Sequence, residues 1–130
     1  MLTGLNRKEI KEYITTQDGG DNPTKFLIGN LLHSERMTFL GSVLIPSGEK
    51  DKDGKIALNM NVAEFNRRSP EIVKAGLKGI KNFFDAEQSK VVDIDVITDE
   101  VIEKIPLTAV YEIAGKIIEW NCLQGAEQKN

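Results

Sequence analysis

An acidic run near the middle of the chain has the residue types of a calcium-binding loop. Glu49, Asp51 and Asp53 stand at alternate positions and Gly54 follows them, an arrangement in which carboxylate oxygens converge and glycine permits a sharp turn. The bidentate glutamate that completes such a loop would fall at Met60. Since Asp-Gly is also a common hairpin-turn dipeptide, the sequence favours a hairpin turn, and we expect no bound metal.

A second motif, Gly76-Leu77-Lys78-Gly79, has the glycine spacing with which some single-strand-binding modules hold a nucleic-acid backbone. Both glycines fall inside a predicted helix, where each costs about 1 kcal/mol relative to alanine, so the close packing of another group against them is the favoured explanation. The formal net charge of −3 also disfavours contact with phosphates, because nucleic-acid-binding surfaces concentrate Lys and Arg. We expect no nucleic-acid partner, and a binding site built on Lys78 or on the acidic run is the alternative.

Three further residues could take part in catalysis. His33 is the only histidine, so a Ser-His-Asp triad would have to include it, but its place at the end of an apolar segment is typical of a strand terminus. Asp93 and Asp95 could bind a metal or exchange protons from one strand face, although alternating acids are typical of a solvated face. The sequence contains no phosphate-loop or dinucleotide-binding motif. We therefore expect a protein that is not an enzyme and that binds no cofactor.

The chain that must position these residues has the composition of one globular domain. Its 130 residues are 40% apolar and 28% charged, which favours a single domain over residues 1–130 with a short polar tail at about 125–130. No apolar run approaches the roughly 20 residues that span a bilayer, so no membrane contact is expected. The single cysteine, Cys122, cannot form an internal disulfide, which favours a buried or half-buried thiol and a reducing, cytoplasmic environment.

Periodicity predicts an α+β fold, in which a small antiparallel sheet (a hairpin plus one or two strands) packs with C-terminal helices. In the first half, a capping-box pattern from Asn6 to Glu9 predicts a short helix. We expect a loop over 17–23, a strand over 24–32 that ends by Ser34 or Glu35, and a hairpin formed by strands over 37–45 and 55–62. The predicted elements of the second half are a helix over 70–84 capped by Ser69, a strand over 90–97 that joins the hairpin's sheet, a short helix capped by Thr98, and a last helix from Pro106 to about Gly125.

The last helix carries more apolar residues than one face needs. Its main stripe consists of Val110, Ile113, Ala114, Ile117 and Ile118. The apolar residues outside this stripe are Tyr111, Trp120, Cys122 and Leu123. A helix packed on two sides explains this pattern, and so does a partner-binding surface near Trp120, because aromatic anchors are enriched at interfaces. On the second interpretation the partner-binding residues are Tyr111, Ile117, Trp120 and Leu123.

The second half also resembles a class of phage proteins. The resemblance covers residues 67–130 and is carried by the run Gly76-Leu77-Lys78-Gly79-Ile80-Lys81-Asn82-Phe83, by Ile97-Thr98-Asp99-Glu100-Val101 leading to Ile105-Pro106, and by the ending Glu127-Gln128-Lys129-Asn130. These features are similar to those of small proteins encoded among the structural genes of tailed bacteriophages and prophages, in particular the tail assembly chaperones. The resemblance implies a non-enzymatic protein of the bacterial cytoplasm that binds the tape-measure protein or tail-tube subunits.

Many tail assembly chaperones are made in a short and an extended form through a ribosomal frameshift. The ending Gln128-Lys129-Asn130 can be encoded CAA AAA AAC, which contains the heptamer A AAA AAC on which a ribosome can slip back one base. Other synonymous codons give no such heptamer, so the protein sequence permits the slip without requiring it. The alternative function is that of a stoichiometric virion component, such as a head–tail adaptor or a tail accessory protein. Both functions are compatible with a homo-oligomer.

Overall fold

The computed structural model describes residues 1–50, 54 and 56–123, and for residues 46–50, 56–58, 122 and 123 it describes the backbone. The elements follow in the order β1 (Ile10–Tyr13), β2 (Lys25–Gly29), α1 (His33–Val43), β3 (Leu44–Lys50), β4 (Ile56–Met60), α2 (Val62–Gly76), β5 (Leu77–Asp85), β6 (Lys90–Ile94), α3 (Asp99–Lys104), α4 (Leu107–Ile118) and a π-helical turn η1 (Glu119–Leu123). Four strands form one antiparallel sheet in the order β1-β2-β5-β6, and β3 pairs with β4 in a separate sheet. The predicted α+β fold is confirmed.

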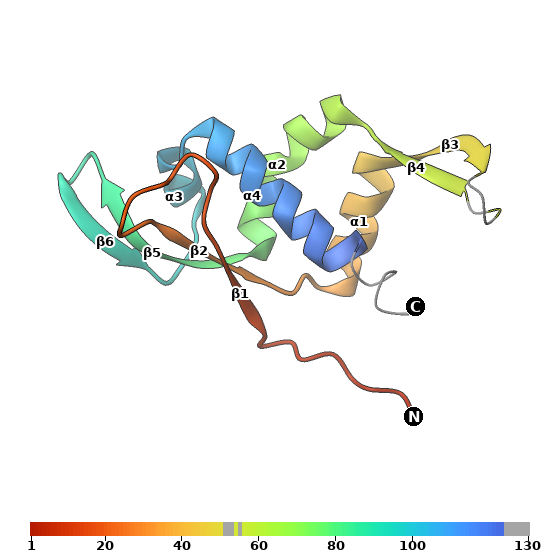
Figure 1. Cartoon of the computed structure of the whole chain (residues 1–130), viewed down its shortest axis with the longest axis horizontal. Coiled ribbons are helices and arrows are strands. Elements are labelled where there is room, and N and C mark those ends of the chain that lie inside the picture. Colours follow the sequence, from red (N-terminus) through yellow and green to blue (C-terminus); the bar gives the residue numbers. More distant parts are fainter. Residues whose placement is uncertain (51–53, 55, 124–130) are drawn as a thin grey trace.

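α2 and α4 lie over one face of the four-stranded sheet, α1 lies beside them away from β5 and β6, and the β3–β4 hairpin projects beyond α1 (Figure 1). The core fills the space between α4, α2 and the sheet. On the sheet side it contains Phe26 and Ile28 of β2 and Ile80 and Phe83 of β5. On the helix side all members of the predicted α4 stripe are buried, which confirms that stripe: Val110, Ile113, Ala114, Ile117 and Ile118.

The first predicted helix is wrong, because the segment after Asn6 forms one turn and then a strand. The Asn6 side chain accepts a hydrogen bond from the Lys8 N–H at 3.1 Å, and the Glu9 N–H donates to the Asn6 carbonyl at 3.2 Å. Residues 10–13 then pair antiparallel with β2, in a register that places Ile10 opposite Gly29. A helix of one or two turns is marginal in water, so pairing with an existing sheet decides the conformation.

The strand predicted over 37–45 is also wrong, since α1 occupies most of it. The Glu35 carboxylate accepts a hydrogen bond from the Leu32 N–H at 2.8 Å and so closes the start of this helix. Phe39 and Val43, one turn apart, are its buried residues. His33 is therefore the first residue of a helix and not the end of a strand. The predicted hairpin exists, but its first strand begins at Leu44, which pairs with Met60.

The helix predicted over 70–84 is displaced along the chain. The observed helix α2 begins at Val62, where the Asn61 side chain accepts a hydrogen bond from the Glu64 N–H at 3.2 Å. Ser69 does not cap a helix, because its hydroxyl donates to the Phe65 carbonyl within α2 at 2.7 Å. Pro70 also lies inside α2, where its missing N–H leaves one carbonyl of the preceding turn without a helical partner.

Residues 77–85 imitate a helix in sequence because the strand that they form contains a bulge. Ile80 and Phe83 are both buried although they are three positions apart, and the β5–β6 register shifts between them. At this point Asn82 has a φ of 60°, and its N–H donates to the Asp93 carboxylate at 2.8 Å. The extra residue converts the period-2 alternation of a strand into helix-like spacing. β6 thus pairs with β5 and not, as predicted, with the β3–β4 hairpin.

The last part of the chain follows the prediction more closely. The Thr98 hydroxyl caps α3 by accepting from the Val101 N–H at 3.3 Å, and α4 begins directly after Pro106. An ion pair at 2.9 Å between the half-buried Lys104 of α3 and the buried Asp85 at the end of β5 holds this helix to the sheet. Gly125, the predicted end of the last helix, lies outside the described residues.

None of the helices among the described residues combines the length and the apolar character needed to cross a bilayer.

Close packing against the two glycines of the Gly-x-x-Gly motif is confirmed, although they lie in different elements. Gly76 is the last residue of α2, and a Cβ built on it would lie 2.5 Å from Cγ2 of Ile117 in α4. Gly79 is in β5, where a Cβ would lie 3.1 Å from the carbonyl oxygen of Ile94 and 3.3 Å from Cδ1 of Leu27. A methyl group at Gly76 would therefore separate α4 from α2.

We predict that Gly76→Ala lowers the free energy of unfolding by about 1–3 kcal/mol, because Ile117 must leave its rotamer or α4 must shift. Gly41→Ala is the matched control, since Gly41 is an exposed residue inside α1 with no atom within 4 Å of a built Cβ. That substitution is expected to raise the free energy of unfolding by about 0.5–1 kcal/mol. Urea unfolding followed by circular dichroism measures both, and equal effects of the two substitutions would contradict the close contact.

Candidate functional site

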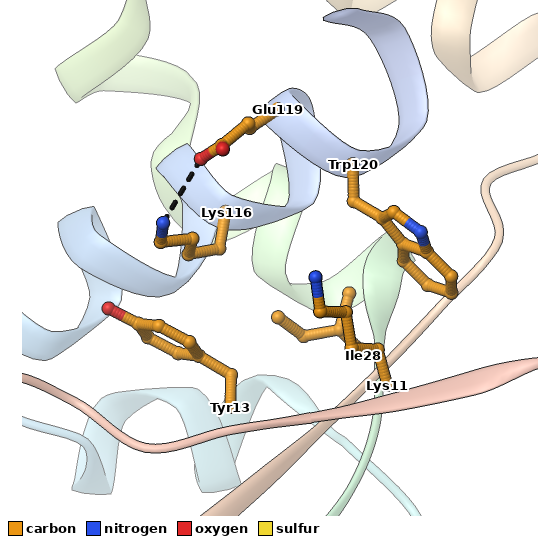
Figure 2. A pocket seen from close by; sticks show the side chains of 6 residues that line it. All are labelled: Lys11, Tyr13, Ile28, Lys116, Glu119 and Trp120. Atoms are coloured by element: carbon orange, nitrogen blue, oxygen red, sulfur yellow. Dashed lines mark hydrogen bonds and ion pairs between the residues drawn. The ribbon is translucent and has the colours of Figure 1, made fainter. Parts of the chain in front are cut away.

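A small pocket opens between the edge of the four-stranded sheet and the end of α4 (Figure 2). Its volume is about 90 Å³, room for roughly three water-sized groups. Ile28 of β2 is almost completely buried and lies at the back of this pocket, and the indole of Trp120 lies on one side. The remaining lining residues are Lys11 and Tyr13 of β1, Lys116 of α4, and Glu119 of η1. Apolar surfaces thus form the floor, and charged side chains of both signs, Lys11, Lys116 and Glu119, stand at the rim.

The side of α4 that faces β1 carries charged residues one turn apart. The Lys116 ammonium lies 3.1 Å from the Glu119 carboxylate and 5.7 Å from the centre of the Tyr13 ring, within the range of a cation–π interaction. One turn earlier, the Glu112 carboxylate accepts hydrogen bonds from the Tyr13 hydroxyl at 2.8 Å, from the Thr16 N–H at 2.9 Å and from the Thr16 hydroxyl at 2.6 Å. These contacts attach the end of β1 to α4 and fix the Tyr13 wall of the pocket.

The hydrogen bonds to Glu112 also determine how this cluster titrates. Partial burial acts to raise the pKa of Glu112, but the hydrogen bonds from Thr16 and Tyr13 outweigh it, so the pKa lies below its ordinary value. Partial burial, the hydrogen bond to Glu112 and the negative charges of Glu112 and Glu119 raise the pKa of Tyr13 to about 12. The folded structure therefore favours an ionised Glu112 and a neutral Tyr13.

The backbone beside Trp120 is held by the side chain of Asn121, which sequence reasoning missed. Asn121 is buried, and its side-chain oxygen Oδ1 accepts a hydrogen bond from the Leu31 N–H at 2.8 Å. Its amide group donates to the carbonyls of Gly29 at 3.2 Å and Ile117 at 3.0 Å. These bonds join η1 to the connection between β2 and α1. A polar residue within an apolar helix end was the signal that could have pointed to it, since a buried amide requires several partners.

The structure separates the four predicted partner-binding residues. Trp120 lines the pocket and is half-buried, whereas Tyr111 is half-buried on α4 and does not line it. Ile117 is completely buried against Gly76, so it is a core residue and not a surface contact. The side chain of Leu123, like that of Cys122, lies outside the described residues. No local pattern indicated that Lys11, Tyr13 or Ile28 would lie beside Trp120.

The other sequence candidates that the structure describes do not line this pocket. Asp51 and Asp53 of the acidic run are outside the described residues, and within the described part of the chain no three His, Cys, Asp or Glu side chains gather as metal ligands would. Asp93 supports the β5 bulge, and Asp95 follows the end of β6, so the two do not share a strand face as predicted. The Lys78 ammonium donates to the Ala75 carbonyl at 2.9 Å.

Comparison with known proteins adds no relative: no protein-family model, curated protein or solved structure shows significant similarity to the chain. The likeness to tail assembly chaperones therefore depends on the sequence features within residues 67–130 alone. Those features fall on the end of α2, on β5, on and beside α3, and on the end of the chain. The segment that they span contains α4, the helix that carries Lys116, but it does not contain β1, which forms the other wall of the pocket.

We predict that Glu112→Gln lowers the free energy of unfolding at pH 7 by about 1–2 kcal/mol, because a neutral amide replaces a carboxylate that accepts three hydrogen bonds. The lowered pKa of Glu112 means that its stabilisation is present above the ordinary glutamate pKa and is lost as the pH falls through the folded value. The difference in the free energy of unfolding between wild type and variant should therefore become smaller below about pH 4. Urea unfolding at pH 7, 5 and 3 measures it, with Glu103→Gln, an exposed position on α3, as control. A difference that does not change with pH would contradict the prediction.

Proposed function

We propose that the protein is a non-enzymatic assembly factor of a tailed phage or prophage, a tail assembly chaperone that binds tape-measure or tail-tube subunits reversibly in the bacterial cytoplasm. The observation that carries the proposal is the pocket beside Trp120, because it lies at the end of α4, a helix within the segment that the resemblance covers. Trp, Tyr and Arg are the residues on which binding energy concentrates at interfaces. A half-buried Trp120 above an apolar floor is such an anchor.

The construction of the site also supports a binding role. The Tyr13 ring is held by the hydrogen bond from its hydroxyl to Glu112. Asn121 holds the η1 backbone that carries Trp120, and the Trp120 side chain packs against the core. A site that is already ordered loses little conformational freedom on binding. Its small volume of about 90 Å³ limits the affinity, which suits a chaperone that must hand its client on.

A specific observation favours the second candidate, a stoichiometric virion component. The β3–β4 hairpin is a separate two-stranded sheet that projects from the body (Figure 1), and two-stranded sheets are marginally stable alone. Its base exposes Ile45 by 47% and Met60 by 42%. Copies of the chain that assemble in a ring could cover these residues, which is the arrangement expected of a head–tail adaptor or tail accessory protein.

We predict that a strain in which the gene is deleted makes few or no complete tails, and that purified particles from the wild type lack the protein. Mass spectrometry of the native gene product, expressed with its downstream DNA, should detect a minor form extended in the −1 frame. Presence in particles at a fixed ring-like copy number would favour the virion component. Normal tail yield after deletion would contradict both functions.

A second measurement connects the function with the site. Trp120→Ala should abolish co-purification of the tape-measure protein, whereas Phe84→Ala, which removes an aromatic ring exposed by 59% on the β5–β6 hairpin, should leave it unchanged. Circular dichroism and thermal unfolding establish that both variants are folded. Equal co-purification with the two variants would place the chaperone's binding surface elsewhere.

A further inference from the structure

The outer edge of β1 lies beside the pocket. β1 is the first strand in the order β1-β2-β5-β6, so one of its edges pairs with β2 and the other has no strand partner among the described residues. An edge strand presents backbone N–H and C=O groups that can pair with another chain. We infer that an extended segment of a client protein adds to this edge of β1 and inserts an aliphatic side chain into the pocket, with an acidic side chain beside Lys11. The identity of the client rests on the proposed function.

The direction of the β1 side chains determines which client residues would face the pocket. Lys11 and Tyr13 both line it, so they point to the helix-covered side of the sheet, and Figure 2 shows both side chains rising from β1 toward α4. Successive side chains of a strand alternate between the two faces. Every second residue of an added strand would therefore stand beside Lys11 or Tyr13. The client residues that matter are thus separated by one residue.

The size and the floor of the pocket specify an aliphatic residue. A volume of about 90 Å³ holds a side chain as large as that of valine, since a water-sized group occupies roughly 30 Å³. Ile28 at the back, the Tyr13 ring and the Trp120 indole present carbon surfaces. Strand addition combines backbone hydrogen bonds with such pockets for alternate side chains.

The charge at the rim specifies the second residue. Lys116 is already paired with Glu119 at 3.1 Å. Lys11 is exposed, and it forms no ion pair with the described residues. An acidic residue two positions from the aliphatic one would lie beside it. β6, the other edge strand, contributes no residue to the pocket, so it offers an edge without this specificity.

Two peptides of identical composition test the spacing. The first, acetyl-Thr-Glu-Thr-Val-Thr-Glu-Thr-amide, places both acids on the same side as the valine in either strand direction. The second, acetyl-Thr-Thr-Glu-Val-Glu-Thr-Thr-amide, places them on the opposite side. Trp120 is the only tryptophan, so its fluorescence reports occupation of the pocket. We expect the first peptide to change the Trp120 fluorescence in a saturable way, with half of the change reached at a peptide concentration below about 1 mM. The second peptide should bind at least about fivefold more weakly.

Amide shifts in nuclear magnetic resonance locate the bound peptide. The first peptide should perturb residues 10–14 and those around the pocket. Lys11→Glu should weaken its binding by about fivefold to tenfold, whereas Lys90→Glu makes the same charge change on β6 and should alter binding by less than about twofold. The spacing comparison in the wild-type chain does not depend on how these variants fold. No saturable response, equal binding of both peptides, or shifts confined to other strands would overturn the proposal.

A second copy of the chain is the other occupant that the β1 edge could accept. Analytical ultracentrifugation separates the two cases: self-association of the wild type that Lys11→Glu abolishes and Lys90→Glu does not would assign this edge to a dimer and overturn the proposal. Failure of strand addition can also be told apart from failure of the chaperone function. If the tape-measure protein co-purifies equally with wild type and Lys11→Glu, strand addition fails and the chaperone function stands. If the first peptide binds at β1 but deletion of the gene leaves the tail yield normal, strand addition stands and the chaperone function fails.

Discussion

The contact between Ile117 and Gly76 determines how closely the helix layer approaches the sheet. Gly76 is the last residue of α2, and β5 begins at the next residue, so Ile117 packs at the junction of the two elements. Only a residue without a side chain leaves room there, since a Cβ would lie 2.5 Å from Cγ2 of Ile117. This close approach lets α4 bury its entire apolar stripe. The position of every other residue on α4 follows from it.

Once α4 is fixed, its flanking polar residues determine where the ends of the chain lie. Glu112 receives three hydrogen bonds from Tyr13 and Thr16, and Asn121 holds the connection after β2. β1 has little burial of its own, because only Tyr13 is partly covered. Pairing with β2 and the bonds to Glu112 therefore supply most of what keeps this strand in place. The pocket is the space between these two attachments.

Sequence reasoning succeeded where local signals agreed and failed where tertiary contacts decided. Thr98 and Pro106 give clear helix starts, and the α4 stripe has an unbroken helical period, so α3 and α4 were predictable. The run through Ile80 and Phe83 misled because a bulge at Asn82 gives a strand the spacing of a helix. The segment from His33 contains Thr, Phe and Val, which favour strands, yet its burial with a helical period makes it α1.

The candidate site was predictable only in part, for the same reason. Trp120 was identified because it lies outside the main stripe of a strongly periodic helix. Lys11 and Tyr13 were assigned to a helix, and nothing local indicates that they meet a residue about a hundred positions later in the chain. Ile117 was predicted to contact a partner. Its residue type alone does not distinguish a core residue from an exposed aliphatic anchor. Its burial depends on the glycine that faces it, which belongs to another element.

The dimensions of the two candidate surfaces connect each with one of the two functions. Burying one aliphatic side chain contributes about 1.5–3 kcal/mol, and each backbone hydrogen bond of a short added strand contributes about 0.5–1.5 kcal/mol net. The loss of translational and rotational freedom on association offsets at least about 4 kcal/mol of this. The proposed binding at the β1 edge would therefore be weak and reversible, as the proposed chaperone function requires. A permanent virion component buries well over about 1,000 Å² of surface. A single pocket of about 90 Å³ contributes only a small part of such an interface. The interface would therefore have to include the β3–β4 hairpin. Occupation of β1 without involvement of the hairpin would thus distinguish a transient client from a structural neighbour.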